Sequence, residues 1–435
     1  MFDASDAPAR SGSPAAPPAP VPAAELPALR RRTSAVLIAS QILGGLGVPI
    51  GIALAPVLAT EVGGSEELSG LGPTASVAGT ALLSLPLAAL MTARGRRPGL
   101  VLAYLIGALG AGLVVLSTLV ESFPLLLLGM AAFGAGSSAN LQARFAAADL
   151  AEPERRGRAI STVIWATTIG SVLGPNIAAP VGRFFRGGPV SEQAGPFVFA
   201  AGIFLVSAMV VGALLRPDPL LTARALAPQD EASAAGRSLR AGIAAVRASP
   251  MARLALTTVA VSHTAMVSIM VMTPVELGHH GAGLQLIGLV ISGHILGMYA
   301  FSPVMGWLSD RLGRLAVIGL AAALLACATL LAGTASGSHG QTAAGLFTLG
   351  LGWSAGLVGG SALLTDSVPQ AARAAVQGLS DLTMNTAAGV GGAVAGVVVA
   401  RAGYGWLNAI GACLLLPMAA LALRRALAPS APPRD

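Results

Sequence analysis

The chain has 435 residues, of which 54% are hydrophobic and only 10% are charged. This composition excludes a water-soluble globular protein and indicates an integral membrane protein. The net charge of +7 does not indicate nucleic-acid binding, because the basic residues are all arginines and most of them lie between apolar runs or near the termini. The two cysteines, Cys327 and Cys413, lie in separate apolar runs and predict no disulfide framework.

In chain order, residues 1–32 are rich in Pro, Ala and Ser and predict a disordered cytoplasmic tail. Twelve apolar runs follow, each long enough to cross about 30 Å of hydrocarbon, which takes about 20 residues of helix. They are 34–58, 68–92, 99–120, 123–147, 158–181, 196–215, 252–275, 283–308, 314–335, 341–364, 375–400 and 404–424. We expect an all-α integral membrane fold with twelve transmembrane helices in two six-helix halves. The halves are 33–216 and 251–426, joined by a cytoplasmic linker at 217–250 and followed by a cytoplasmic tail at 427–435.

The placement of arginine predicts how the chain is oriented. With the N-terminus inside, the outer connections hold only Arg183, Arg186 and Arg401. Cytoplasmic loops carry an excess of basic residues, so both termini and the linker are expected in the cytoplasm, with the protein in the cytoplasmic (inner) membrane. The inner connections and the linker hold Arg94, Arg96, Arg97, Arg155, Arg156, Arg158, Arg216, Arg224, Arg237, Arg240, Arg247, Arg311, Arg314 and Arg373.

The two halves share a repeated sequence pattern. Gly95-Arg96 follows the second apolar run and Gly313-Arg314 follows the eighth, and the two pairs are 218 residues apart. Asp149 and Asp366 follow the fourth and tenth runs at a nearly equal separation. A repeat of six helices is the plan of many secondary transporters, in which the substrate site lies between the halves near the middle of the membrane. The chain contains no P-loop motif that would indicate ATP-driven transport.

The segment Gly306-Trp-Leu-Ser-Asp-Arg-Leu-Gly-Arg314 resembles the signature loop of the major facilitator superfamily. The first-half copy is degraded, because Thr92 and Ala93 stand where Asp and Arg are expected. The resemblance implies a transporter rather than an enzyme, without a bound cofactor and expected to be monomeric among membrane lipids. It also implies gating and structural roles for Gly306, Asp310, Arg311, Gly313, Arg314 and Asp366.

A second motif lies in the fifth apolar run. Residues Gly170 to Pro175 resemble the start of a motif typical of proton-linked drug exporters, although Ala178 and Ala179 replace its later glycine pair. A purely structural interpretation is also open, because proline kinks a helix and glycines allow close packing. The run therefore leaves two alternatives: a packing bend, or an exporter of small organic compounds.

Soft metal ligands are concentrated in the seventh and eighth runs. Met266 and Met270 are four residues apart, as are His294 and Met298, so each pair shares one helix face. Thioether sulfur and imidazole nitrogen favour Cu(I), and a histidine inside a membrane helix is a functional candidate. The alternative is that the methionines fill gaps in apolar packing. If the two helices face each other, the four side chains form a descending series, with Met266 beside His294.

These paired motifs resemble those of the CcoA-like copper importers of the CalT family. The resemblance implies that the four residues bind copper, expected as Cu(I), on its way into the cytoplasm for cytochrome oxidase assembly. It also implies a copper chaperone or an oxidase-assembly protein as partner. The same family contains proteins linked to riboflavin, which leaves riboflavin import open, although only 4% of the residues are aromatic. A membrane receptor or assembly factor that holds copper without transporting it is a further alternative.

Four other residues complete the candidate set. His263 is either an additional metal ligand or a hydrogen-bonded packing residue, and His279 and His280 either capture metal at the outer mouth or are merely solvated. Asp381 lies inside the eleventh run, where a charge costs about 2.5–3.5 kcal/mol if it is central. We therefore expect Asp381 to have a partner, and to serve either proton coupling or the gate beside Asp310.

Overall fold

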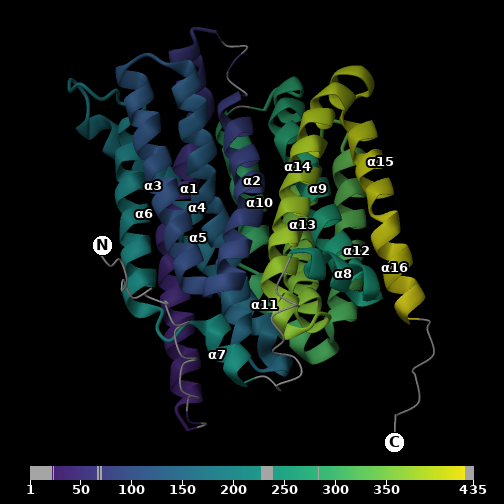
Figure 1. Ribbon diagram of the computed structural model, residues 1–435. Helices are drawn as coiled ribbons and strands as arrows, with labels where there is room; N and C mark the ends of the chain where they lie inside the picture. Colours follow the sequence, from purple (N-terminus) through teal and green to yellow (C-terminus); the bar gives the residue numbers. More distant parts are fainter. Residues whose placement is uncertain are drawn as a thin grey trace, which may run out of the picture.

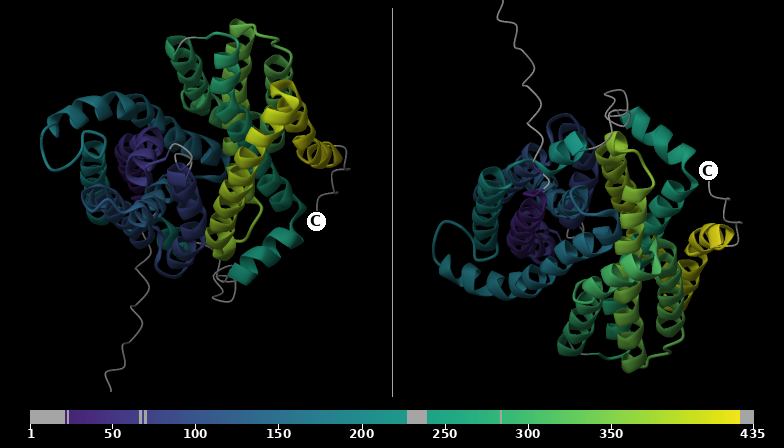
Figure 2. Two further views of the ribbon diagram at one scale, coloured as in Figure 1. Left: turned by 90° about the horizontal axis from the view of Figure 1, so that it is seen from above. Right: turned by 90° about the horizontal axis from the view of Figure 1, so that it is seen from below.

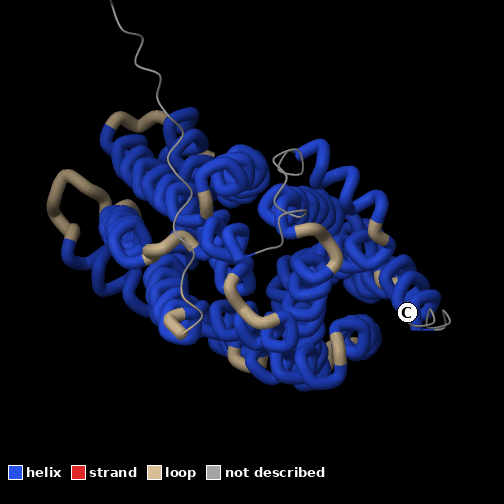
Figure 3. The backbone as a smooth tube through the Cα atoms, turned by 60° about the horizontal axis from the view of Figure 1, so that its bottom comes forward, coloured by secondary structure: helices blue, strands red, loops and turns tan. Residues whose placement is uncertain are grey.

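The computed structural model describes residues 22, 24–65, 68, 71–226, 239–282 and 284–426. The regular structure of these residues is entirely helical (Figure 3). Residues 1–21 of the predicted N-terminal tail, residues 227–238 of the predicted linker and the predicted C-terminal tail at 427–435 lie outside the described residues. The tail boundary at residue 32 is wrong, because helix α1 already begins at Leu26, with Pro27 in its first turn, where a missing N–H costs no hydrogen bond.

The first half contains six long helices. They are α1 (Leu26–Gly63), α2 (Leu71–Arg94), α3 (Arg96–Leu119), α4 (Phe123–Asp149), α5 (Arg156–Phe184) and α6 (Gly195–Leu214), with a short 3-10 turn at Pro153–Arg155. Two short helices, α7 (Pro219–Leu226) and α8 (Leu239–Ala248), lie within the predicted linker. The second half contains α9 (Pro250–His279), α10 (Leu284–Tyr299), α11 (Ser302–Leu312), α12 (Arg314–Gly333), α13 (His339–Asp366), α14 (Arg373–Ala402), α15 (Tyr404–Leu414) and α16 (Leu416–Ala426), with a 3-10 turn at Gln370–Ala372.

The predicted spans correspond to these helices, with two interruptions. By length and hydropathy, eleven helical segments of the described chain are able to cross a membrane, counting α10 with α11 and α15 with α16. The fifth predicted run is α5, a 29-residue helix that is not among those eleven. The eighth and twelfth runs break just before Pro303 and Pro417, because proline lacks an N–H and its ring clashes with the preceding turn.

The two halves lie side by side (Figures 1 and 2). Buried apolar side chains form one core cluster in the first half and another centred in the second half. In the first half, Phe133, Phe197, Phe204 and Tyr104 pack together between α3, α4 and α6. The second-half core is mainly aliphatic and also includes Met266, Met298 and Met305. The halves meet chiefly where α2 packs on α14 and where α5 packs on α10 and α11. These two seams are where any rocking of one half against the other must act.

The predicted repeat is visible in the backbone. Gly95 separates α2 from α3 with φ 94°, and Gly313 separates α11 from α12 with φ 92°. Both lie in the left-handed region that only glycine enters without strain. In each half, the arginine that follows this glycine binds the aspartate at the end of the fourth helix of that half: Arg96 binds Asp149, and Arg314 binds Asp366. The end of the bundle that holds these pairs, at the bottom of Figure 1, is called the lock end below.

Orientation remains a prediction from the arginine pattern. Reporter fusions at the C-terminus and within 227–238 should both give a cytoplasmic signal, because the lock end carries most of the arginines. A periplasmic signal at either position would overturn the proposed orientation.

Candidate transport site and inter-half contacts

His294 is fully buried in α10, and its ring orientation is defined. Its Nδ1 lies 2.7 Å from the backbone carbonyl oxygen of Leu346 in α13. A carbonyl only accepts, so Nδ1 carries the hydrogen, and in the neutral ring the lone pair is left on Nε2. Nε2 is buried and has no hydrogen-bond partner among the described residues. A ring nitrogen donating to a carbonyl while the other offers a lone pair is the usual arrangement of a metal-binding histidine.

The methionines lie in or against the second-half core. Met266 is 2% exposed and Met298 is 6% exposed, whereas Met270 is half-buried against that core. This burial agrees equally well with packing and with a dry, soft ligand set. Cys327 and Cys413 are free and exposed on α12 and α15, so neither belongs to this buried set.

One geometric assumption about the four candidate ligands is wrong. Helices α9 and α10 have little direct contact, and both instead pack extensively against α13, which is therefore their shared neighbour. Glycines make the α10–α13 approach possible, because a Cβ on Gly350 would lie 2.9 Å from the backbone nitrogen of Met298. The two helices that carry the motifs therefore both pack on α13 and do not face each other directly as the expected series requires.

His263 is held differently from His294. The indole Nε1–H of Trp353 donates to its Nδ1 at 2.8 Å, so a neutral His263 ring carries its hydrogen on Nε2. Neither nitrogen then offers a free lone pair while this bond stands, which favours the hydrogen-bonded packing role over the ligand role. Tyr299 packs edge-on against Trp353, with ring centroids 5.5 Å apart. Together, His263, Trp353 and Tyr299 form an aromatic cluster contributed by α9, α13 and α10.

Asp381 has the partner that its position requires. It is 1% exposed, and it accepts hydrogen bonds at 2.7 Å from both Arg144 and the amide of Gln142. Both donors lie on α4, in the other half, whereas Asp381 lies on α14. Sequence reasoning missed Arg144, although a lone arginine inside the fourth apolar run is as costly as Asp381 and signals an ionic partner in the same way.

Arg96 extends this buried network at the lock end. Its guanidinium binds Asp149 at 2.7 Å and Gln142 at 3.0 Å within the first half, and it also donates to Gln377 on α14. Arg96 and the side chain of Asp149 are completely buried. Charged and amide groups of α3 and α4 are therefore bonded to α14 of the other half, beside the α2–α14 seam.

The second seam is closed by Asp310. Its two carboxylate oxygens accept from the backbone N–H groups of Gly157 and Arg158, at 2.8 and 2.9 Å. These N–H groups belong to the first turn of α5, where a helix favours negative charge. The seam is tight because a Cβ on Gly306 would lie 2.7 Å from the carbonyl oxygen of Gly157. Gly306 and Asp310 thus both join α11 to the opposite half.

Asp366 lies between two arginines. Arg314 donates to it at 3.1 Å, and Arg156 of the other half forms an ion pair with it. Arg314 also binds Asp310 at 2.5 Å and the carbonyl of Pro153 at 2.6 Å. Arg311 does not pair with Asp366 and instead lies 5.2 Å over the ring of Trp307. The lock end is therefore closed in this conformation at both seams.

We expect Asp310→Asn to slow transport several-fold while leaving cargo binding in detergent largely unchanged. The amide loses the charge that attracts the α5 N-terminus and Arg314, yet it keeps its volume. Transport assays alongside equilibrium binding would measure the two effects separately. An equal loss of binding would show that the loop belongs to the cargo site.

The glycines of the fifth-run motif lie at a close contact between helices. Gly170 packs against Gly45 of α1, as the packing interpretation of this motif requires. The side chains of Pro175, Ala178 and Ala179 lie outside the described part of the chain.

The two histidines at the end of α9, His279 and His280, are exposed, and His280 Nδ1 lies 3.0 Å from the carbonyl oxygen of Glu276. Among the described residues, no group of three or more His, Cys, Asp or Glu side chains is arranged to hold a metal.

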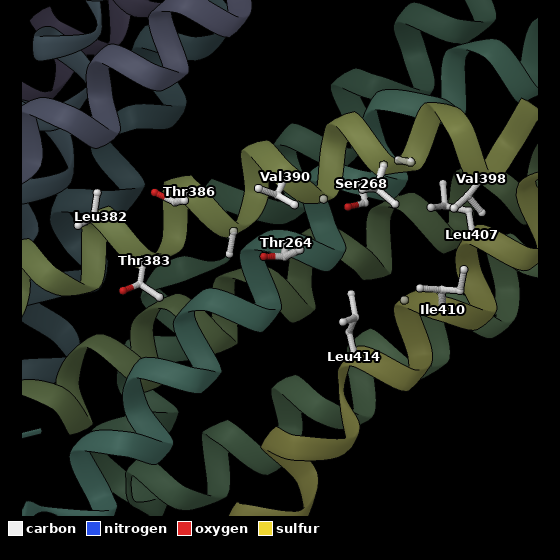
Figure 4. A pocket seen from close by; sticks show the side chains of 15 residues that line it. Thr264, Ser268, Leu382, Thr383, Thr386, Val390, Val398, Leu407, Ile410 and Leu414 are labelled. Carbon is white, nitrogen blue, oxygen red and sulfur yellow. The ribbon is translucent and has the colours of Figure 1, made fainter. Parts of the chain in front are cut away.

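A groove of about 700 Å³ lies between α9, α14 and α15 (Figure 4). Aliphatic side chains line most of it, together with hydroxyls that include Thr264 and Ser268. At 100° per residue, these two hydroxyls lie roughly opposite His263, Met266 and Met270 on the helix. The groove is therefore separate from the candidate ligands.

Two six-helix halves, a repeated Gly-Arg corner and inter-half charge contacts at one end define a secondary transporter of the alternating-access type. The chain belongs to the Major Facilitator Superfamily, whose family model matches residues 35–285 and 254–435. It is 37% identical over 392 residues to the uncharacterized MFS-type transporter YddS of Bacillus subtilis, covering 89% of each chain. It is 28% identical over 393 residues to the riboflavin transporter RfnT of Brucella anthropi, covering 90% of this chain and 94% of that one.

Solved structures show the same fold at low identity. The E. coli fucose:proton symporter FucP matches with a TM-score of 0.71 at 16% identity, covering 91% of this chain and 98% of that chain. The human organic anion transporter MFSD10 matches with a TM-score of 0.70 at 18% identity, covering 90% and 99%. These likenesses establish the fold and leave the cargo open.

Proposed function

We propose that this transporter imports copper, as Cu(I), across the cytoplasmic membrane. The observation that carries the proposal is His294, whose Nδ1 donates to the carbonyl of Leu346 and whose buried Nε2 has no partner among the described residues. A buried polar atom without a partner destabilises the fold, so its presence calls for a functional explanation. A transported ion that visits Nε2 would supply that use.

The surrounding side chains suit a soft, monovalent ion. Met298 lies one turn from His294 on the same face, and Met266 lies in the same apolar core. Thioethers and imidazole favour Cu(I), whereas Zn(II) and Mn(II) prefer nitrogen and oxygen ligands. Neutral ligands bind less tightly than thiolates, which suits an ion that must leave on the other side. In this proposal Met266, Met270, His294 and Met298 are the copper ligands, and cytochrome oxidase assembly is the use of the imported copper.

The test is uptake of radioactive copper by cells with and without the protein. We expect accumulation that depends on the protein, and no comparable uptake of zinc or manganese. Equal copper uptake by cells with and without the protein would reject the proposal, provided that the protein is present in the membrane of the first set of cells. A receptor or assembly factor that only holds copper would bind the ion without accumulating it, so uptake also separates that alternative.

Riboflavin import is the second candidate, because the RfnT relative aligns over almost the whole chain. The cluster of His263, Trp353 and Tyr299 would offer ring faces and a hydrogen-bond donor to a flat heteroaromatic cargo. Uptake of labelled riboflavin in the same cells discriminates the two cargoes. Efflux of organic compounds, which the Gly170–Pro175 motif suggests, would instead lower the cellular content of such compounds.

Asp381 is proposed to couple transport to protons. Its two donors, Arg144 and Gln142, belong to the other half, so alternating access must break these bonds. Protonation of the carboxylate removes the charge that attracts Arg144 and makes the break less costly.

A further inference from the structure

A second groove, of about 540 Å³, lies at the lock end between α1, α4 and α5. Four arginines line it: Arg30 and Arg31 from the first turns of α1, Arg155 from the turn before α5, and Arg158 from the first turn of α5. The lining also includes the hydroxyl side chains of Thr33, Ser34 and Thr162. The rim of this groove is therefore rich in hydrogen-bond donors.

The charge of this groove is not balanced. Glu152 is the acidic residue in its lining, and it is already engaged by Arg30 and, at 3.5 Å, by Arg155. The guanidinium groups of Arg31 and Arg158 have no ion pair within the described chain. The surplus of positive charge is suited to an anion, and arginine binds phosphate oxygens in a planar, bidentate manner.

The depth of the groove is apolar. Ile38, Ala147, Ala159 and Val163 also line it, and all four lie close to the ends of the predicted spans. Ile38 and Val163 lie further from the lock end along α1 and α5 than Arg31 and Arg158. Positive charge above an apolar wall, at the depth where membrane helices leave the hydrocarbon, matches a lipid headgroup with the start of its acyl chains. A free phosphate would use the arginines but leave the apolar wall without a contact. We propose that this groove binds the headgroup of an anionic phospholipid from the adjacent leaflet.

Four consecutive residues, 155–158, connect the groove to the contacts of Asp310 and Asp366 that join the two halves, which are called the lock below. Arg155 and Arg158 line the groove, whereas Arg156 forms an ion pair with Asp366 and the N–H groups of Gly157 and Arg158 bind Asp310. A lipid phosphate that fixes the two groove arginines also fixes the backbone that the lock uses. The bound lipid therefore favours the conformation with the lock end closed, to the extent that it binds this conformation more tightly.

The test uses the purified full chain in nanodiscs of phosphatidylcholine with increasing fractions of phosphatidylglycerol. We expect phosphatidylglycerol to remain bound in native mass spectrometry and to slow hydrogen exchange of the segment 153–162. The double variant Arg31→Gln/Arg158→Gln should weaken this retention by about tenfold or more, because each arginine near a membrane surface contributes to anionic-lipid binding. The matched control, Arg183→Gln/Arg401→Gln, removes the same charge from exposed sites at the opposite end and should change neither readout.

Three results would each contradict the proposal of a bound lipid. Equal retention of phosphatidylglycerol by the variant and the parent would show that the groove does not hold the lipid. Equal slowing of exchange by inorganic phosphate or glycerol 3-phosphate in phosphatidylcholine nanodiscs would assign the groove to a soluble anion. Retention of phosphatidylglycerol without slower hydrogen exchange of the segment 153–162 would show that the bound lipid does not stabilise the contacts between the halves. None of these results depends on which cargo the protein carries.

Discussion

Replacing His294 by asparagine should abolish most copper uptake while the protein remains in the membrane. The asparagine amide can still donate to the carbonyl of Leu346, but it has no nitrogen lone pair at the position of Nε2. We expect a loss of at least about tenfold, as for other changes that disturb a metal-binding histidine. Met266→Leu and Met298→Leu should lower uptake similarly, since leucine keeps the volume at a cost under about 1.5 kcal/mol. Radioactive copper uptake, normalised to the amount of membrane protein, measures these effects.

Two variants serve as controls for this experiment. Met209→Leu changes an exposed methionine of α6 in the other half and should leave uptake unchanged. His263→Gln should retain far more copper uptake than His294→Asn, because the Nδ1 of His263 is occupied by Trp353. If His294→Asn, Met266→Leu and Met298→Leu all accumulate copper like the parent, the soft-ligand assignment is wrong and the riboflavin proposal takes its place.

Asp381→Asn should both destabilise the protein and stop accumulation of the cargo. The substitution leaves Arg144 buried without its counter-charge, and breaking a buried pair in this way costs about 3–5 kcal/mol. Thermal unfolding in detergent should therefore shift to a clearly lower temperature. The double variant Arg144→Met/Asp381→Leu replaces both charges by apolar groups and should recover most of the stability without recovering transport.

The matched control for this pair lies at the surface. Glu192→Gln breaks the exposed contact with Arg186 and should change the unfolding temperature little, because surface ion pairs contribute little to stability. If Asp381→Asn unfolds at the temperature of the parent, the buried pair is not a stabilising contact between the halves. If the double variant transports normally, Asp381 has no part in coupling.

The fold could be predicted from the sequence because its signals are local and repeated. Apolar runs of membrane-spanning length gave the long helices, and the recurrence of Gly95-Arg96 at Gly313-Arg314 gave the two halves, which the left-handed glycines and paired arginine–aspartate bonds confirm. The two breaks before Pro303 and Pro417 could have been expected from the rule for prolines in helices. The early start of α1 could not, since its first residues resemble the Pro- and Ala-rich tail before them.

The site was harder to predict because it depends on which helices are neighbours. Helical spacing predicts Met266 and Met270 on one face of α9. It says nothing about α13, which lies against both motif helices and supplies Leu346 and Trp353. The different states of His263 and His294 follow from one hydrogen bond each, to groups far away in the sequence. Asp381 signalled its need for a partner, but the partner, Arg144, is 237 residues away.

Transport by the purified protein in liposomes, offered radioactive Cu(I) and labelled riboflavin in parallel, tests the central claim most directly. The proposal predicts that copper accumulates inside the liposomes, that riboflavin does not, and that His294→Asn removes the copper signal while Met209→Leu keeps it. Accumulation of riboflavin without copper, or copper accumulation that is unaffected by His294→Asn, would contradict the proposal.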